Sequence, residues 1–172
     1  MRRAMTVRVV GPEQWILIPA VAALGATLVL AMPIRLFGFF LPEPVFPMLL
    51  AFAWPLIRPS VFAPLVLALL GLTLDLIWYT PLGLWSLSLL AVYAVVLTFR
   101  NLLAGQETLF LFVWYAAGCI LAFLIAWLIV SAKAENAPSL VAVGWQFLAT
   151  VVLFPVAHFM LERFDDGDVR FR

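Results

Sequence analysis

Charged residues are scarce in this chain of 172 residues. Only 11% of the residues are Asp, Glu, Lys or Arg, whereas 66% are hydrophobic. A soluble domain carries about a quarter charged residues, so this composition excludes most soluble classes and is typical of an integral membrane protein. The formal net charge of +1 argues against a nucleic-acid partner. We therefore expect a single integral membrane domain over residues 1–172, with short tails at 1–14 and 162–172.

The residue types that build most chemical sites are also scarce. Cys119 is the only cysteine and His158 the only histidine. A lone cysteine excludes an intrachain disulfide and a cysteine metal site, and a lone histidine completes neither a metal site nor a catalytic triad. Glycine-rich phosphate loops are missing as well. The sequence therefore predicts no enzyme activity, no cofactor and no metal, and it predicts that His158 packs beside Glu162, one helical turn away.

Long hydrophobic runs are what the sequence does contain. A helix needs about 20 apolar residues to cross the hydrocarbon core of a bilayer. Six runs, separated by short polar connections, predict an all-α bundle of six transmembrane helices over residues 15–34, 44–57, 61–79, 81–99, 109–131 and 139–161. The first run is long enough to be a retained helix and does not resemble a cleaved signal.

The second run is the shortest, roughly 21 Å long as a helix. It contains Pro44, Pro47 and Pro55, and proline removes a backbone donor and kinks a helix. Carbonyl groups that lose their partner in lipid must find another within the protein. We therefore expect this helix to be bent and packed against its neighbours, with a re-entrant or broken segment as the alternative.

The basic residues favour six crossings with both chain ends in the cytoplasm. With that orientation only Arg35 and Lys133 lie outside, and the cytoplasmic arginines are Arg2, Arg3, Arg8, Arg58, Arg100, Arg163, Arg170 and Arg172. Removing the second crossing would move Arg58 and Arg100 to the outer side. Since basic residues concentrate on the cytoplasmic side of membrane proteins, the arrangement with six helices fits better.

Asp75 is the only charged residue between Arg58 and Arg100. A carboxylate that faced lipid would be costly, so we expect it to face protein or water. Thr80 is predicted to be the N-cap of the next helix and Pro81 its first residue. Asp75 would then point toward the positive end of that helix, with Gly83 permitting a close approach.

Three roles for Asp75 follow from this placement. It would order the corner between the two helices, bind a partner chain or ligand at the outer face, or take part in catalysis or proton transfer. The sequence favours the first role over the second. The third lacks a second intramembrane carboxylate for acid–base chemistry.

A stripe of small residues indicates close helix packing. Gly118, Ala122 and Ala126 recur every four residues, a spacing that lets two helix backbones approach each other. Packing within the chain is favoured, and an interface with a partner is the alternative.

Several residues between Trp54 and Arg100 stand at the spacings of a known family pattern. They are an aromatic residue followed by Arg-Pro, then Gly-Leu, Asp-Leu, Pro-Leu-Gly, Leu and Tyr, here Trp54, Arg58, Pro59, Gly71, Leu72, Asp75, Leu76, Pro81, Leu82, Gly83, Leu87 and Tyr93. This pattern resembles MreD, the small membrane protein of the bacterial rod-shape system. Two departures stand out: the family commonly has a glycine where this chain has Trp78-Tyr79-Thr80, and often a small residue where Ser86 stands.

The resemblance implies a scaffold without enzyme activity in the bacterial inner membrane. MreD-like proteins associate with MreC and work with the rod-shape actin, a glycan polymerase and a transpeptidase in lateral peptidoglycan synthesis. For contact with MreC at the outer face, the charged candidates are Asp75, Arg35 and Lys133.

The family fold is similar to the substrate-binding subunits of energy-coupling-factor transporters, which supplies the alternative function. A pocket for a small molecule needs several convergent polar groups. The outer half of this chain offers Asp75, Thr73, Thr80 and Gln146.

Overall fold

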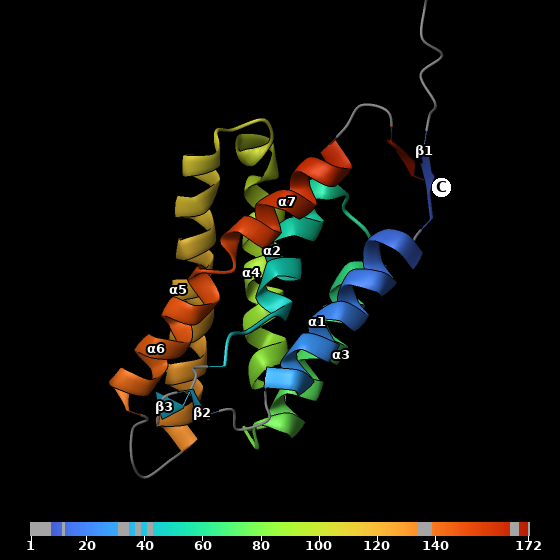
Figure 1. Cartoon of the computed structure of the whole chain (residues 1–172). Coiled ribbons are helices and arrows are strands. Elements are labelled where there is room, and N and C mark those ends of the chain that lie inside the picture. Colours follow the sequence, from blue (N-terminus) through green and yellow to red (C-terminus); the bar gives the residue numbers. More distant parts are fainter. Residues whose placement is uncertain are drawn as a thin grey trace, which may run out of the picture.

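The computed structural model describes residues 8–11, 13–30, 35–36, 39–40, 43–133, 139–165 and 169–171. Over these residues the fold is all-α apart from very short strands (Figure 1). A π-helical turn, Glu13–Leu17, leads into the first of seven helices: α1 (Ile18–Leu30), α2 (Pro47–Ile57), α3 (Phe62–Ile77), α4 (Leu84–Leu103), α5 (Thr108–Lys133), α6 (Leu140–Val151) and α7 (Phe154–Asp165).

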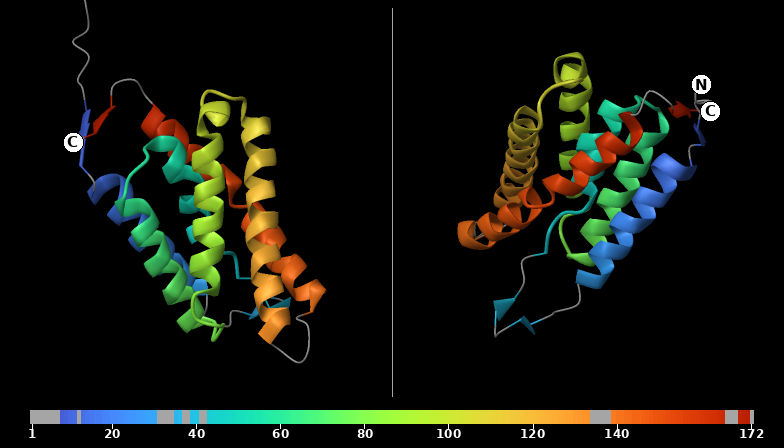
Figure 2. Two further views of the ribbon diagram at one scale, coloured as in Figure 1. Left: turned by 180° about the vertical axis from the view of Figure 1, so that it is seen from behind. Right: turned by 45° about the horizontal axis from the view of Figure 1, so that its top comes forward.

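Two pairs of short strands accompany the helices. Near the chain ends, β1 (Arg8–Val10) pairs in parallel with β4 (Val169–Phe171). The other pair is antiparallel and joins β2 (Arg35–Leu36) to β3 (Phe39–Phe40). Figure 2 shows β1 and β4 side by side, so the described segments nearest to the two chain ends lie at the same end of the bundle.

The helices follow the six hydrophobic runs of the sequence. Three helical stretches in the described part are long and apolar enough to cross a membrane: Leu84–Leu103, Thr108–Ala132 and Leu140–Phe164. The other three are apolar but shorter: Gln14–Leu30, Pro47–Ile57 and Phe62–Ile77. Large apolar side chains are exposed on α1, α3, α5 and α6, as expected of helix faces that meet lipid rather than water.

Helix α2 occupies the middle of the bundle (Figure 1). Every residue from Pro47 to Pro55 is buried, which confirms the prediction that this helix packs against its neighbours. Pro47 stands in the first turn, where its missing N–H is not needed. The Trp54 indole Nε1 donates a hydrogen bond to the Trp15 carbonyl at 3.0 Å, tying α2 to the start of the first helical segment. With 11 residues, α2 is only about 16 Å long.

Helices α3 and α4 touch through their backbones. A Cβ atom at Gly71 would overlap the Cα and N atoms of Ser86, so only glycine permits this approach. The Ser86 hydroxyl donates a hydrogen bond to the Ala68 carbonyl at 2.7 Å. Gly71 and Ser86 therefore form one close contact, and the small side chain at position 86 is part of it.

The sixth hydrophobic run is broken, whereas the sequence predicts one helix over 139–161. Helix α6 ends at Val151 and α7 begins at Phe154. Pro155 has no N–H to donate to the preceding turn. Next to the break, the Thr150 carbonyl accepts hydrogen bonds from the Leu153 N–H at 3.1 Å and from the Tyr115 hydroxyl at 3.0 Å. The Thr150 hydroxyl accepts one from the Val45 N–H at 3.1 Å. The break is thus fastened to α5 and to the entry of α2.

Candidate functional site

Asp75 lies in the last turn of α3 and is only 1% exposed. Its Oδ1 atom accepts hydrogen bonds from the Thr80 hydroxyl at 2.8 Å and from the Trp85 N–H at 3.1 Å. Its Oδ2 atom accepts one from the Gly83 N–H at 2.7 Å. Both oxygens of the carboxylate are thus engaged within the stretch from Asp75 to Trp85, which we call the Asp75 corner.

The Asp75 corner starts α4 in a different way from the sequence prediction. Thr80 was expected as the N-cap and Pro81 as the first helical residue, and this prediction is wrong because α4 begins at Leu84, with Gly83 at the N-cap. The Thr80 hydroxyl donates to Asp75 rather than accepting from the helix. The capping oxygen comes instead from Asp75, since Trp85 is the second residue of α4 and its N–H would otherwise lack a partner.

Electrostatics explains why a carboxylate is tolerated here. A buried charge requires hydrogen-bond partners or an opposite charge, and Asp75 has three donors. It also stands at the N-terminus of α4, where the helix dipole carries partial positive charge. With its acceptors already engaged, Asp75 fits the ordering role.

Two residues of the corner adopt left-handed backbone conformations. Gly83 has a φ of 89° and Tyr79 a φ of 54°. Glycine adopts such angles without strain, whereas a side chain with a Cβ atom does so at a cost. A glycine in this stretch is part of the MreD-like pattern, whereas in this chain Tyr79 adopts the left-handed conformation at that cost. Its side chain is 95% exposed, and Leu82 beside it is also exposed.

Glu43 is a polar neighbour of the corner that the sequence reasoning missed. The Trp78 indole Nε1 donates a hydrogen bond to Glu43 Oε2 at 2.5 Å, and the rings of Trp78 and Trp85 pack edge to face with centroids 5.4 Å apart. Glu43 precedes α2 and is far from Trp78 in sequence. Only its position in a mostly apolar chain, between two hydrophobic runs, was available as a signal.

The residues of the MreD-like pattern fall into two groups at opposite ends of α3. Asp75, Thr80, Pro81, Leu82 and Gly83 form the corner after its last turn. Trp54, Arg58, Pro59 and Tyr93 gather before its first turn, where the Tyr93 hydroxyl donates to the Ser60 carbonyl at 3.3 Å and the Arg58 N–H donates to the Trp54 carbonyl. Gly71 lies between the two groups, at the contact with α4.

The small-residue stripe on α5 faces the interior of the chain. Gly118, Ala122 and Ala126 are all buried. A Cβ atom at Gly118 would meet side-chain atoms of Val92 and Met48 at 3.3 and 3.4 Å, from α4 and α2. The geometry therefore matches packing within the chain, the reading that the sequence favoured.

Three of the polar side chains proposed for an outer pocket make hydrogen bonds within the protein. Asp75 and Thr80 bond each other, whereas the Thr73 hydroxyl donates to the Leu70 carbonyl of its own helix. The backbone carbonyl of Gln146 accepts from the Thr150 hydroxyl within α6. The side chains of Arg35 and Lys133 lie outside the described residues.

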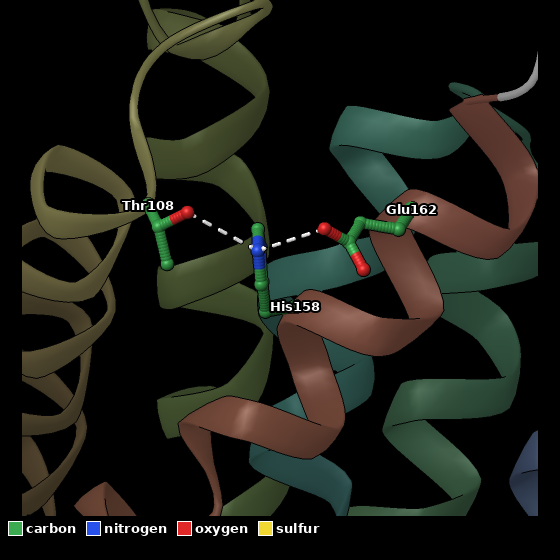
Figure 3. Close-up of polar contacts among 3 residues, drawn as sticks. All are labelled: Thr108, His158 and Glu162. Carbon is green, nitrogen blue, oxygen red and sulfur yellow. Dashed lines mark hydrogen bonds and ion pairs between the residues drawn. The ribbon is translucent and has the colours of Figure 1, made fainter.

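His158 contacts Glu162 as the sequence predicts, and it also reaches α5. In Figure 3 the ring of His158 stands between Thr108 and Glu162. Its Nε2 atom lies 3.2 Å from Thr108 Oγ1 and 3.2 Å from Glu162 Oε1. Thr108 begins α5, so this contact joins the start of α5 to the middle of α7.

A cavity of about 330 Å³ adjoins this histidine. It lies at the C-terminal end of α4, whereas the Asp75 corner lies at the N-terminal end. We call the end with the cavity the basic end, because it holds Arg58, Arg100 and Arg163, which follow or fall within the last turns of α2, α4 and α7. Residues of α2, α4, α5, α7 and the α4–α5 connection line the cavity: Leu56, Ile57, Leu103, Ala104, Gly105, Gln106, Leu111, His158, Leu161, Glu162 and Phe164.

Within the described ranges, no group of three or more His, Cys, Asp or Glu side chains is placed to hold a metal ion. Cys119 is buried and, in the described part of the chain, is a free thiol. Comparison of the chain with protein-family models, with curated proteins and with solved structures finds no match.

Proposed function

We propose that this chain is an MreD-like scaffold of the bacterial rod-shape machinery. It would cross the inner membrane six times with both ends in the cytoplasm, bind MreC, and help to organise lateral peptidoglycan synthesis without catalysing a reaction. The observation that carries the proposal is the Asp75 corner, because the residues of the MreD-like pattern from Asp75 to Gly83 act there as one folded unit.

The exposed surface supports the membrane part of the proposal. Leu65, Leu69 and Leu76 on α3 are well exposed, as are Ile120, Leu124 and Leu128 on α5. Extended apolar faces of this kind are rare on soluble monomers. The three long helical stretches, α4, α5 and the broken stretch of α6 and α7, have the length that a bilayer requires. The short helix α2 is enclosed by protein, so it need not match the thickness of the lipid.

The corner supports the binding part. Asp75 holds the turn in one conformation, and the turn presents Tyr79 and Leu82 to the surroundings. A rigid turn loses little conformational entropy when a partner binds, and exposed tyrosine is a common anchor at protein interfaces. We therefore place the contact with MreC at the tip of the corner, on the outer face.

Tyr79→Gly provides the direct test. Glycine adopts the φ of 54° without strain, so the variant should fold at least as well as the wild type while lacking the aromatic contact. Recovery of MreC by affinity purification from native membranes should fall several-fold. Leu69→Ala, which removes an exposed apolar side chain from α3 outside the corner, should leave recovery unchanged. Full recovery of MreC with Tyr79→Gly would exclude the tip as its binding site.

The orientation has its own experiment. Cysteine tags at both termini should resist an impermeant thiol reagent in whole cells and react after lysis. Labelling of either terminus in whole cells would overturn the arrangement of six crossings and the outer placement of the corner.

The transporter-subunit alternative has less support. Asp75 and Thr80 use their polar atoms on each other and on the backbone. The cavity that the structure describes lies at the opposite end of α4, about 30 Å away along its 20 residues.

A further inference from the structure

The cavity at the basic end lies outside the proposed contact with MreC. Its volume of about 330 Å³ falls in the range of small ligand sites, which starts near 300 Å³. Its wall combines apolar side chains with three polar ones, Gln106, His158 and Glu162. Such a mixture suits a ligand that has a polar head and an apolar body.

Charge at the cavity favours a cation. Glu162 is the only acidic side chain among the described lining residues, and no lysine or arginine lines the cavity there. The carboxylate is 66% exposed, and the contact of its Oε1 atom with His158 fixes its position. The C-terminal end of α4, at Leu103 and Ala104, adds partial negative charge. An ammonium group would meet acceptors from both elements.

The same place also offers positive potential for an anion. Helix α5 begins at Thr108, so its N-terminal dipole opens beside the cavity. Arg58, Arg100 and Arg163 stand at this end without lining the cavity. A ligand with an ammonium group and a phosphate a few ångströms apart would match both sets of charges.

The surroundings indicate a lipid rather than a soluble zwitterion. Next to Thr108 and His158 in sequence, Leu109 and Phe159 are exposed, and Val156 is exposed one turn before. These exposed apolar side chains stand on α5 and α7, two of the helices that line the cavity. Acyl chains would lie against them while the headgroup occupied the cavity.

We propose that the cavity bounded by Gln106, His158 and Glu162 binds the headgroup of an aminophospholipid, phosphatidylethanolamine, from the cytoplasmic leaflet. The primary ammonium would donate hydrogen bonds to Glu162 and to acceptors at the end of α4. Phosphatidylcholine has the same phosphate, but its quaternary ammonium has no N–H to donate. The proposal depends on the membrane part of the proposed function and is independent of MreC.

The test compares lipids in nanodiscs. Wild-type protein is reconstituted in phosphatidylglycerol mixed with an equal fraction of phosphatidylethanolamine or of phosphatidylcholine, and thermal unfolding is followed by tryptophan fluorescence. A headgroup at ten times its dissociation constant should raise the melting temperature by roughly 3–6 °C. Native mass spectrometry should show a retained phosphatidylethanolamine molecule.

Three variants connect the effect to the cavity. Glu162→Gln should abolish the preference for phosphatidylethanolamine, and Glu162→Asp should retain part of it. Glu107→Gln removes an exposed carboxylate at the same end that does not line the cavity, and it should retain the full preference. Equal unfolding of wild type and Glu162→Gln in phosphatidylcholine establishes that the substitution leaves the fold intact.

Several results would overturn the proposal. The first is an equal melting temperature of the wild type in the two lipid mixtures. The second is an equal loss of the phosphatidylethanolamine preference in Glu107→Gln and Glu162→Gln. The third is a full rise in melting temperature when free ethanolamine is added to phosphatidylcholine discs. A polypeptide retained by the wild type and lost by Glu162→Gln, without any lipid preference, would assign the cavity to a protein instead. Recovery of MreC without lipid preference refutes only this inference, whereas lipid preference without recovery of MreC refutes only the scaffold.

Discussion

Replacing Asp75 should measure how strongly the corner depends on its carboxylate. Asp75→Leu removes three acceptor contacts and leaves the N–H groups of Gly83 and Trp85 and the Thr80 hydroxyl without this partner. An unpaired buried donor costs about 1–3 kcal/mol. Trp85 is buried, whereas Gly83 and Thr80 are partly exposed and recover some hydration. We therefore expect a loss of about 3–5 kcal/mol in the free energy of unfolding.

Asp75→Asn should be milder, for a reason visible in the bond pattern. The amide oxygen can replace Oδ1 and accept from Thr80 and Trp85, but the amide nitrogen would then face the Gly83 N–H, which is also a donor. One bond is lost and two remain, so the expected cost is about 1–2 kcal/mol. Asn should also preserve more function than Leu in rescuing the shape of cells that lack the protein.

Thermal unfolding of the purified protein in detergent, followed by tryptophan fluorescence, measures both costs. At about 2–4 °C per kcal/mol for a chain of this size, the melting temperature should fall by roughly 2–8 °C for Asn and 6–20 °C for Leu. Thr73→Val removes a hydroxyl that bonds only its own helix and should change little. If Asp75→Leu had the same melting temperature as the wild type, or if Asn lowered it as much as Leu, the carboxylate would not stabilise the corner in the way described.

Two further substitutions test the packing that positions the corner and the break in the last span. Gly71→Ala would place a methyl group against the backbone of Ser86 and should lower the free energy of unfolding by about 2–3 kcal/mol through overpacking. The control is Gly25→Ala, because a Cβ atom at Gly25 meets nothing within 4 Å. This control should be neutral or slightly stabilising in the same melting assay. Equal melting of these two variants would contradict the close contact of α3 and α4. Thr150→Val deprives the buried Val45 N–H of its acceptor and should lower the free energy of unfolding by about 1–3 kcal/mol. Thr150→Ser keeps a hydroxyl and should retain most of that stability. A serine variant as unstable as the valine variant would exclude the hydroxyl as the cause.

Much of the helical framework follows from hydrophobic run length, which is a local property. The runs at 81–99 and 109–131 match α4 and α5 because a long apolar run in this composition has no alternative to a helix. The burial of Asp75 against polar groups of the protein was also predictable, since a single charge in such a run needs partners. The contact between His158 and Glu162 was predictable as well, because residues four apart in sequence share a helix face.

Other features depended on contacts between distant residues and were missed. The start of α4 at Leu84 follows from a capping oxygen supplied by Asp75, ten residues before Trp85, so local capping rules pointed to Thr80 instead. The hydrogen bond between Trp78 and Glu43 joins the Asp75 corner to the segment before α2, and no regular spacing in the sequence predicts this contact. The break between α6 and α7 is joined to α5 by the hydrogen bond from the Tyr115 hydroxyl to the Thr150 carbonyl, across 35 residues of sequence.

Hydrophobic run length and the cost of an unpaired charge can be read from the residues alone, so the sequence predicts a bundle of apolar helices in which Asp75 needs polar partners. Three features emerge only when the helices pack together: the enclosure of α2, the contact of Gly71 with the backbone of Ser86, and the polar cavity beside His158 at the basic end. These features arise where helices from distant parts of the chain come within van der Waals distance, and the order of residues along one helix does not specify which neighbour it will meet.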